Sequence, residues 1–208
     1  MQSNKMMEKL LPEGWRWVKL GDVCSEKIDS YDPTNDPDEF YYVDISSIDN
    51  IVKKIKEPKL ICGKDAPSRA RQLIFQEDVI VSTTRPNLNA VAIVPKELDK
   101  QICSTGFCVL RAGSKIISDY LFHFVQSDFF VDNLSDLVED ALYPAVTNSQ
   151  VRSQLIPLPP LPEQQRIAAR LREQMQAVDE ARQAVEAQLK AINQLPSALL
   201  RQAFSGEL

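Results

Sequence analysis

The feature that most constrains the fold is a cluster of prolines followed by a long stretch without proline or glycine. The segment "LPPLPEQQRIAARLRE" covers residues 158–173 and has prolines at three of its first five positions, and the next proline is Pro196. Proline lacks a backbone N–H and disfavours helical geometry in the residue before it, so residues 156–162 cannot form a regular helix. This stretch predicts a stiff extended connector, after which Pro162 and Glu163 suit the first turn of a helix.

The residues after the prolines have the periodicity of a helix that pairs with another helix. We expect this helix over 163–195, with a break or kink at Pro196 and a short helix over 197–204. Apolar residues recur seven apart, with others four residues from that row, so they form a narrow seam beside a wide polar flank. The expected interface residues are Ile167, Leu171, Val178, Val185, Leu189, Ile192 and Leu199.

Two partners for this seam are open. One is the chain's own globular domain, and the other is a second chain in a coiled coil. A helix over 163–195 would span about 50 Å, which is more than a domain of about 145 residues readily covers. We therefore favour an intermolecular coiled coil.

The residues before the prolines predict one α+β domain, so the expected organisation is a globular domain over 1–157 and a proline junction with a long helix over 158–208. Aromatic and β-branched runs indicate strands, and apolar residues at helical spacing indicate a helix that Ser118 would cap. The expected strands cover 40–48, 88–95 and 107–112, and residues 72–84 are expected to form one strand or two around a turn at Glu77 and Asp78. The helix covers 118–138, and an acidic loop covers 29–40.

Composition places the chain among ordinary soluble proteins. It has 208 residues, of which 44% are hydrophobic and 25% charged, and no apolar run approaches a membrane span. The N-terminus does not have the pattern of a secretion signal. The four cysteines include no C-x-x-C pair, so we expect reduced thiols in a cytoplasmic protein with no membrane association.

The charge is unevenly distributed along the chain. The net charge is −5, yet residues 51–115 carry twelve basic and six acidic side chains, a balance of +6. The flanking segments 12–50 and 116–150 balance at −7 and −6. A basic segment within an acidic chain can mark a binding face, and it can equally be part of a mixed solvated surface.

Catalytic signatures are scarce. The six glycines form neither G-x-G-x-x-G nor a phosphate loop, so we expect no cofactor. With His123 as the only histidine, neither a hydrolase triad nor a zinc site is expected. One loose pattern, Asp38 followed by Glu57 and Lys59, has the spacing of a nuclease metal site, although Pro58 would disturb the strand that such a site needs.

The segment "STTRPNLNA", residues 82–90, holds the best candidates for DNA contacts. A strand ends there, and polar side chains that can read base edges or bind phosphates follow it. Ordinary turn chemistry would use the same residue types. The candidate DNA-binding residues are Arg69, Arg71, Thr83, Thr84, Arg85, Asn87, Asn89, Tyr143 and Asn148.

Three segments together resemble the specificity subunit of type I restriction–modification systems. They are "LPEGWRWVKLGDV" at 11–23, "LIPLPPLPEQQRIAARL" at 155–171 and "LLRQAFSGEL" at 199–208. The resemblance implies a non-catalytic target recognition domain that reads double-stranded DNA. It also implies methyltransferase subunits as partners and a translocating nuclease subunit in the full assembly.

The chain departs from that family in carrying one recognition domain and one helix, where typical members carry two of each. Since the seam already calls for a second helix, we expect an antiparallel homodimer that reads two inverted, identical half-sites. The 50 Å helix limits their spacer to less than about 14 base pairs. Pairing with a different half-subunit, or a place within a longer protein, is the alternative. Two rival functions for the chain are also open. One is a coiled-coil adaptor that reads no DNA, and the other is a stand-alone metal-dependent nuclease.

Overall fold

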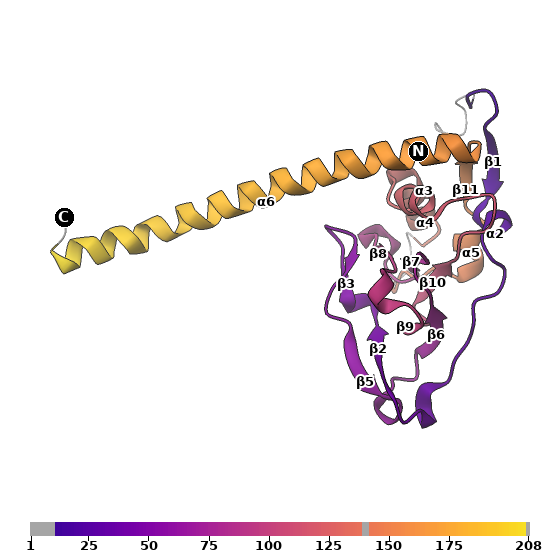
Figure 1. The fold of residues 1–208 in the computed structure, drawn as a ribbon, viewed down its shortest axis with the longest axis horizontal. Helices are drawn as coiled ribbons and strands as arrows, with labels where there is room; N and C mark the ends of the chain where they lie inside the picture. The colour runs from indigo at the N-terminus through magenta and orange to yellow at the C-terminus, as the bar shows by residue number, and fades with distance from the viewer. Residues whose placement is uncertain (1–10, 139–141, 207–208) are drawn as a thin grey trace. The chain divides into compact units, whose positions relative to one another are not determined.

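The computed structural model of this chain describes residues 11–138 and 142–206. The expected domain's residues 1–10, and Glu207 and Leu208 of the C-terminal segment, lie outside these ranges. The chain divides into two compact units, one up to Ala168 and one from Ala169 onward. The first unit contains the strands and short helices seen in Figure 1, and the second is purely helical. This arrangement agrees with the expected α+β class.

A three-stranded antiparallel sheet lies at the centre of the first unit. Its order is β10-β7-β8, formed by β7 (Val79–Ser82), β8 (Val91–Ile93) and β10 (Phe107–Leu110). Every residue of β7 and β10 is buried. Strands that are buried on both faces must lie between two other layers, which explains why "VIVS" and "FCVL" are almost continuously apolar.

One of these outer layers is a four-stranded sheet. Its order is β5-β2-β9-β6, and β2 and β9 run parallel. Ile80 and Val109 of the central sheet share a core with Ile74 and Cys103 of this layer. The four strands are β2 (Glu39–Val43), β5 (Lys59–Cys62), β6 (Ala70–Ile74) and β9 (Gln101–Ser104).

The other outer layer is helical. Val79, Val81 and Leu110 point away from the four-stranded sheet and share a core with Leu121 and Phe130. These two residues belong to α3 (Ser118–Phe124) and α4 (Asp128–Asp136), which lie next to the central sheet in Figure 1. Two shorter helices, α2 (Leu20–Val23) and α5 (Asn148–Arg152), complete the layer.

The proline-rich segment is extended, as predicted, but residues 155–158 form a buried strand of the domain instead of a separate connector, and residues 161 and 162 already belong to the C-terminal helix. Strand β11 (Leu155–Leu158) pairs antiparallel with β1 (Arg16–Lys19), and Pro157 lies opposite Trp17. Within residues 11–138 and 142–206 this sheet has two strands, so a proline without an N–H can be accommodated at its free edge. The extended geometry that proline imposes is therefore used to bury Ile156 and Leu158.

Two predicted elements are divided by capping side chains. The helix expected over 118–138 is two helices, because the Ser127 hydroxyl accepts a hydrogen bond from Phe130 N and starts α4. Ser118 does not cap α3, whose N-cap is Ile117. The strand expected over 40–48 ends at Val43, where Asp44 and Ser47 form a capping box.

Short elements follow that capping box and occupy other loops. The strand expected over 88–95 is shortened to 91–93, because its first residue lies in a 3₁₀ turn. The remaining elements are β3 (Ile48–Asp49), β4 (Lys54–Ile55), and the 3₁₀ helices η1 (Pro33–Asn35), η2 (Ile45–Ser47), η3 (Gly63–Asp65), η4 (Pro86–Leu88) and η5 (Lys96–Leu98).

The C-terminal helix is longer than expected. Helix α6 (Leu161–Ser205) continues through Pro196, so the predicted break there was wrong. A proline removes one helical hydrogen bond, and on this exposed stretch the carbonyl that it leaves free can be solvated. Along the described ranges, α6 included, no helix is both long enough and apolar enough to span a membrane.

Candidate nucleic-acid interface

Backbone hydrogen bonds join four loops of the first unit into one surface. Thr105 N donates to Arg69 O at 2.9 Å, and Thr83 N donates to Gly106 O at 2.9 Å. Val146 N then donates to Thr83 O at 2.8 Å. The loops are distant in sequence but contiguous in space. We call residues 66–71, 82–89, 104–106 and 142–148 the recognition face.

The loop that follows β7 has an unusual and well-anchored backbone. Arg85 and Asn89 have φ values of 49° and 45° on either side of η4. Left-handed geometry costs a non-glycine residue about 1–2 kcal/mol. Arg85 N donates to Pro144 O at 2.8 Å, and Thr84 forms a bridge with Ala145. These contacts hold the loop in one conformation and present its outer side chains on a rigid base.

Five of the predicted DNA-binding residues lie on this face with exposed side chains. Arg69 and Arg85 have no ion pair with any residue that the structure describes, so both guanidinium groups can accept an external anion. Asn148 begins α5, which Thr147 caps. Tyr143 is 85% exposed. The five residues are Arg69, Arg85, Asn87, Tyr143 and Asn148.

The other four candidates use most of their polar groups inside the domain, although the buried Asn89 Oδ1 has no hydrogen-bond partner in the described part of the chain. Thr83 is buried and donates to Gly106 O, and Thr84 lies 3.3 Å from the Ser82 hydroxyl. Asn89 donates through Nδ2 to Gln126 O. Arg71 lies 3.5 Å from the Asp32 carboxylate. Their positions suggest that they shape the recognition face more than they extend from it.

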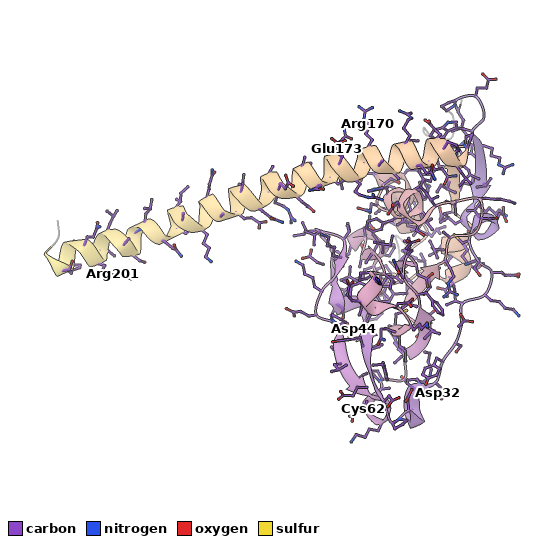
Figure 2. All side chains as sticks on the ribbon, in the orientation of Figure 1. Asp32, Asp44, Cys62, Arg170, Glu173 and Arg201 are labelled. Atoms are coloured by element: carbon purple, nitrogen blue, oxygen red, sulfur yellow. The ribbon has the colours of Figure 1, made fainter. Side chains whose placement is uncertain are left out.

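Carboxylates from the acidic segment neutralise part of the basic segment. Lys59 and Lys56 pair with Asp44 and Asp49 at 2.6 Å, and Asp44 and Asp32 are labelled in Figure 2. Hydrogen bonds from Thr34, with a smaller effect from the Arg71 charge, lower the pKa of Asp32. The charge available for an external anion is therefore smaller than the balance of +6 suggests.

Sequence reasoning missed two residues of the recognition face. Thr105 is exposed in the tight turn between β9 and β10, directly between Arg69 and Thr83. Leu142 is 88% exposed next to Tyr143. Only the short "STG" turn between two apolar runs could have indicated Thr105, because its neighbours on this face come from distant parts of the sequence.

The loose nuclease pattern is not assembled. Asp38 precedes β2, and Glu57 precedes β5 in a left-handed conformation. Strands β2 and β5 are antiparallel, with Glu39 opposite Cys62 and Tyr42 opposite Lys59. Asp38 and Glu57 thus lie at opposite ends of this pair, and Lys59 bonds Asp44 instead. Within the described residues, no three His, Cys, Asp or Glu side chains are grouped to hold a metal ion.

The apolar seam of α6 is largely exposed, and side chains radiate from the helix all along the stretch between Arg170 and Arg201 (Figure 2). Val185 is 63% exposed, and Ile192 is 59% exposed. Ile167 differs from the other predicted interface residues because it packs against the core of the first unit. Arg182 interrupts the seam and pairs with Asp179 at 3.2 Å.

Comparisons with known proteins agree with this fold. The chain is similar to a crystal structure of the HsdS subunit from Thermoanaerobacter tengcongensis, with 48% identity and a TM-score of 0.79 over 94% of this chain and 50% of that one. A structure of a type I R-M system, described in terms of its assembly and conformational transition, matches with 48% identity and a TM-score of 0.80, over 96% and 50% of the two chains.

A curated protein is more distantly similar. The EcoDI type I restriction enzyme specificity subunit of Escherichia coli is 25% identical over 198 residues, which cover 95% of this chain and 43% of that protein. The chain thus spans about half the length of the relatives that it matches. The expected resemblance to specificity subunits is confirmed.

A family model for the type I restriction modification DNA specificity domain matches residues 12–191. The match includes the recognition face, the proline-containing strand β11 and most of α6. The chain therefore belongs to the family of type I restriction modification DNA specificity domains.

Proposed function

We propose that this specificity subunit is a non-catalytic DNA reader with one recognition domain, and that two copies pair through α6. The exposed apolar seam carries the proposal. Val178, Leu189 and Leu199 are each more than half exposed, and burying one such side chain contributes about 1.5–3 kcal/mol. A seam repeated along several turns is a substantial drive for association with another helix.

A second copy is the occupant that the seam suits best. A symmetric pair presents the same surface from both chains, and an antiparallel arrangement carries the two recognition domains to opposite ends. Arg182 within the seam supports a defined pairing, because a polar residue at such a position favours one register over the others. We infer that the pair reads two identical, inverted half-sites.

The helix length limits the distance between those half-sites. The residues from Ala169 to Ser205 span about 55 Å at the rise of an α-helix. That length corresponds to about 16 base pairs at 3.4 Å each. Because α6 continues past Pro196, this upper limit is slightly larger than the one that the sequence pattern implies.

The recognition face supplies both kinds of DNA contact. Cationic side chains such as Arg69 bind phosphates and orient the domain, whereas groups on the anchored loop, Arg85 and Asn87, reach base edges. Exposed Tyr143 adds a planar side chain and directly precedes Pro144, whose carbonyl accepts a hydrogen bond from Arg85 N. The preformed backbone of this loop reduces the ordering cost of binding.

Catalysis belongs to other subunits in this proposal. The paired helices act as a platform for methyltransferase subunits, which carry the methyl donor and extrude the target base. A restriction subunit completes the assembly, and the specificity subunit itself needs no cofactor. The four cysteines are free thiols, which suits a cytoplasmic location for the proposed assembly.

The Arg85→Ala variant tests base reading. We expect it to weaken binding to the cognate site by about 1–3 kcal/mol, while binding to random-sequence DNA changes much less. Fluorescence anisotropy with both duplexes at fixed salt measures the two affinities. Arg166→Ala, which changes an exposed arginine on α6, is the matched control and should leave the ratio unchanged. Equal losses on both duplexes would assign Arg85 to a phosphate instead.

The rival function is a coiled-coil adaptor that reads no DNA. Exposed Arg69 and Arg85 on the anchored recognition face favour the DNA reader. An adaptor predicts no salt-dependent binding to any duplex, whereas phosphate contacts make affinity fall steeply as salt rises. A salt titration of the purified chain with duplex DNA separates the two functions.

A further inference from the structure

A buried glutamine holds the first two turns of α6, which belong to the first unit. Gln164 is fully buried, although it lies on a helix that is otherwise mostly exposed. Its Nε2 donates to Pro159 O at 2.9 Å and to Lys115 O at 3.0 Å. Its Oε1 accepts from Ile117 N at 3.1 Å. One side chain thus joins α6 to strand β11 and to the start of α3.

The hydrogen-bonding capacity of this amide is almost fully used. Both Nε2 hydrogens are donated and the oxygen accepts one bond. Burying an amide is costly unless such partners are present. The three partners are backbone atoms, whose positions are set by the chain path. Hydrogen bonds are directional, so Gln164 defines both the position and the rotation of the first turn.

The other contacts of this turn are less directional. Ala168 is buried, and Ile167 packs against the same core. Apolar contacts of this kind tolerate small slides and rotations better than a set of three hydrogen bonds does. The adjacent Gln165 is exposed and forms no such set.

We infer that Gln164 is a positioning residue that holds the first two turns of α6, residues 161–168, in one place within the first unit, and that it thereby sharpens the spacer length that a dimer accepts. The inference rests on the proposed bipartite reading. One added base pair moves a half-site by 3.4 Å and rotates it by about a tenth of a turn. A domain held rigidly at its junction rejects such a change, and a loosely held domain tolerates it.

The test is a set of duplexes with two inverted half-sites and spacers that differ by single base pairs. The half-sites are first defined by selecting bound sequences with the wild-type chain. For the wild type, the ratio of Kd on the next-longer spacer to Kd on the best spacer measures discrimination. We expect Gln164→Met to lower this ratio by at least about fivefold, which corresponds to one buried hydrogen bond. Gln165→Met is the matched control and should keep the wild-type ratio.

Binding to a duplex with a single half-site separates positioning from simple loss of folding. That affinity should be the same for the wild type and Gln164→Met, because the hydrogen-bond partners of Gln164, which are Lys115, Ile117 and Pro159, are not part of the recognition face. If Gln164→Met does not fold, Gln164→Asn serves as the second variant, because it remains a neutral amide but is one methylene shorter and cannot reach all three backbone partners. The same reduction in spacer discrimination is expected of it.

Two failures are distinguishable. If the wild type binds all spacers equally, the bipartite function itself is wrong. If the wild type discriminates sharply and the folded Gln164 variant keeps the same ratio, the positioning role is wrong while the proposed function stands.

Discussion

Asp78 and Arg111 form an ion pair in which the carboxylate is almost completely buried. Asp78 is 1% exposed at the start of β7, and its carboxylate accepts from Arg111 Nε at 2.9 Å and from Phe75 N at 2.9 Å. The Arg111 guanidinium also lies 4.5 Å from the centre of the Phe75 ring. A buried carboxylate is tolerated only when such partners compensate for lost hydration.

Removing the arginine should therefore destabilise the fold. Arg111→Met leaves the Asp78 carboxylate without its cation. We expect the free energy of unfolding to fall by about 3 kcal/mol. This value is near the lower end of the range for breaking a buried ion pair, because Arg111 is partly exposed. Urea denaturation followed by circular dichroism measures the change. Arg166→Met removes an exposed ion pair and should leave the urea midpoint unchanged. An Arg111 variant as stable as the wild type would contradict the account of this pair.

The four cysteine thiols differ in burial, and we therefore expect them to differ in reactivity. Burial raises the pKa of Cys24 to about 11 and that of Cys108 to about 12, and it also raises the pKa of Cys103. Cys62 is the partly exposed thiol among the four. At pH 8, a thiol reagent should label Cys62 alone in the native chain and all four thiols in denaturant.

The same shifts have a consequence for stability. The thiol pKa is higher in the folded chain than the ordinary value of 9.0, so unfolding releases protons between the two values. The contribution is fully present below pH 9 and is lost as the pH rises toward 11 and 12. In the labelling experiment at pH 8, rapid reaction of Cys103 or Cys108 in the native chain would contradict the burial of these two thiols.

The residue types in the sequence identified only some of the side chains that are exposed on the recognition face. Arg69, Arg85 and Asn87 are exposed as expected, whereas the polar groups of Thr83 and Asn89 bond Gly106 and Gln126. These partners are remote in sequence, and a single chain carries no local signal of them. The same reason hides Thr105, whose place on the face depends on the pairing of β9 with β6 and of β10 with β7.

At the scale of elements, periodicity was the informative signal. The buried strand β7 and the long helix α6 follow from apolar pattern and helix propensity alone. The short strands β1, β5, β9 and β11 have no clear alternation and were not predicted, because partners elsewhere in the chain stabilise them. The division between α3 and α4 depends on one capping hydroxyl, Ser127, which the helical spacing across residues 118–138 conceals.

The pairing of α6 gives a prediction at this scale. Val185→Asp places a charge within the proposed apolar seam and should weaken dimerisation by at least tenfold, since it removes burial worth about 1.5–3 kcal/mol and adds desolvation of a carboxylate. Sedimentation velocity over a concentration series measures the dissociation constant. Ala187→Asp adds the same charge on the polar flank and serves as the control. Equal effects of the two variants would place the interface elsewhere.

Across the whole molecule, the proposed function needs two parts, a recognition domain with a fixed surface and a helix that pairs with a second copy. The three-layer domain holds the recognition face, β11 and Gln164 hold the first turns of α6, and the exposed seam supplies the contact with a second copy. Each part has its own physical basis, yet bipartite reading requires all of them together. The family match identifies a type I restriction modification DNA specificity domain over residues 12–191, and the pairing of two such domains is the proposal.

The mass of the chain bound to DNA is the sharpest test of reading by two paired copies. Multi-angle light scattering is measured on the complex with a duplex that carries two inverted, optimally spaced half-sites. The account predicts a protein mass twice the 23.5 kDa of one chain, and a single bound chain when one half-site is scrambled and the seam carries Val185→Asp. One 23.5 kDa chain bound to the intact bipartite duplex at saturating concentration would contradict it.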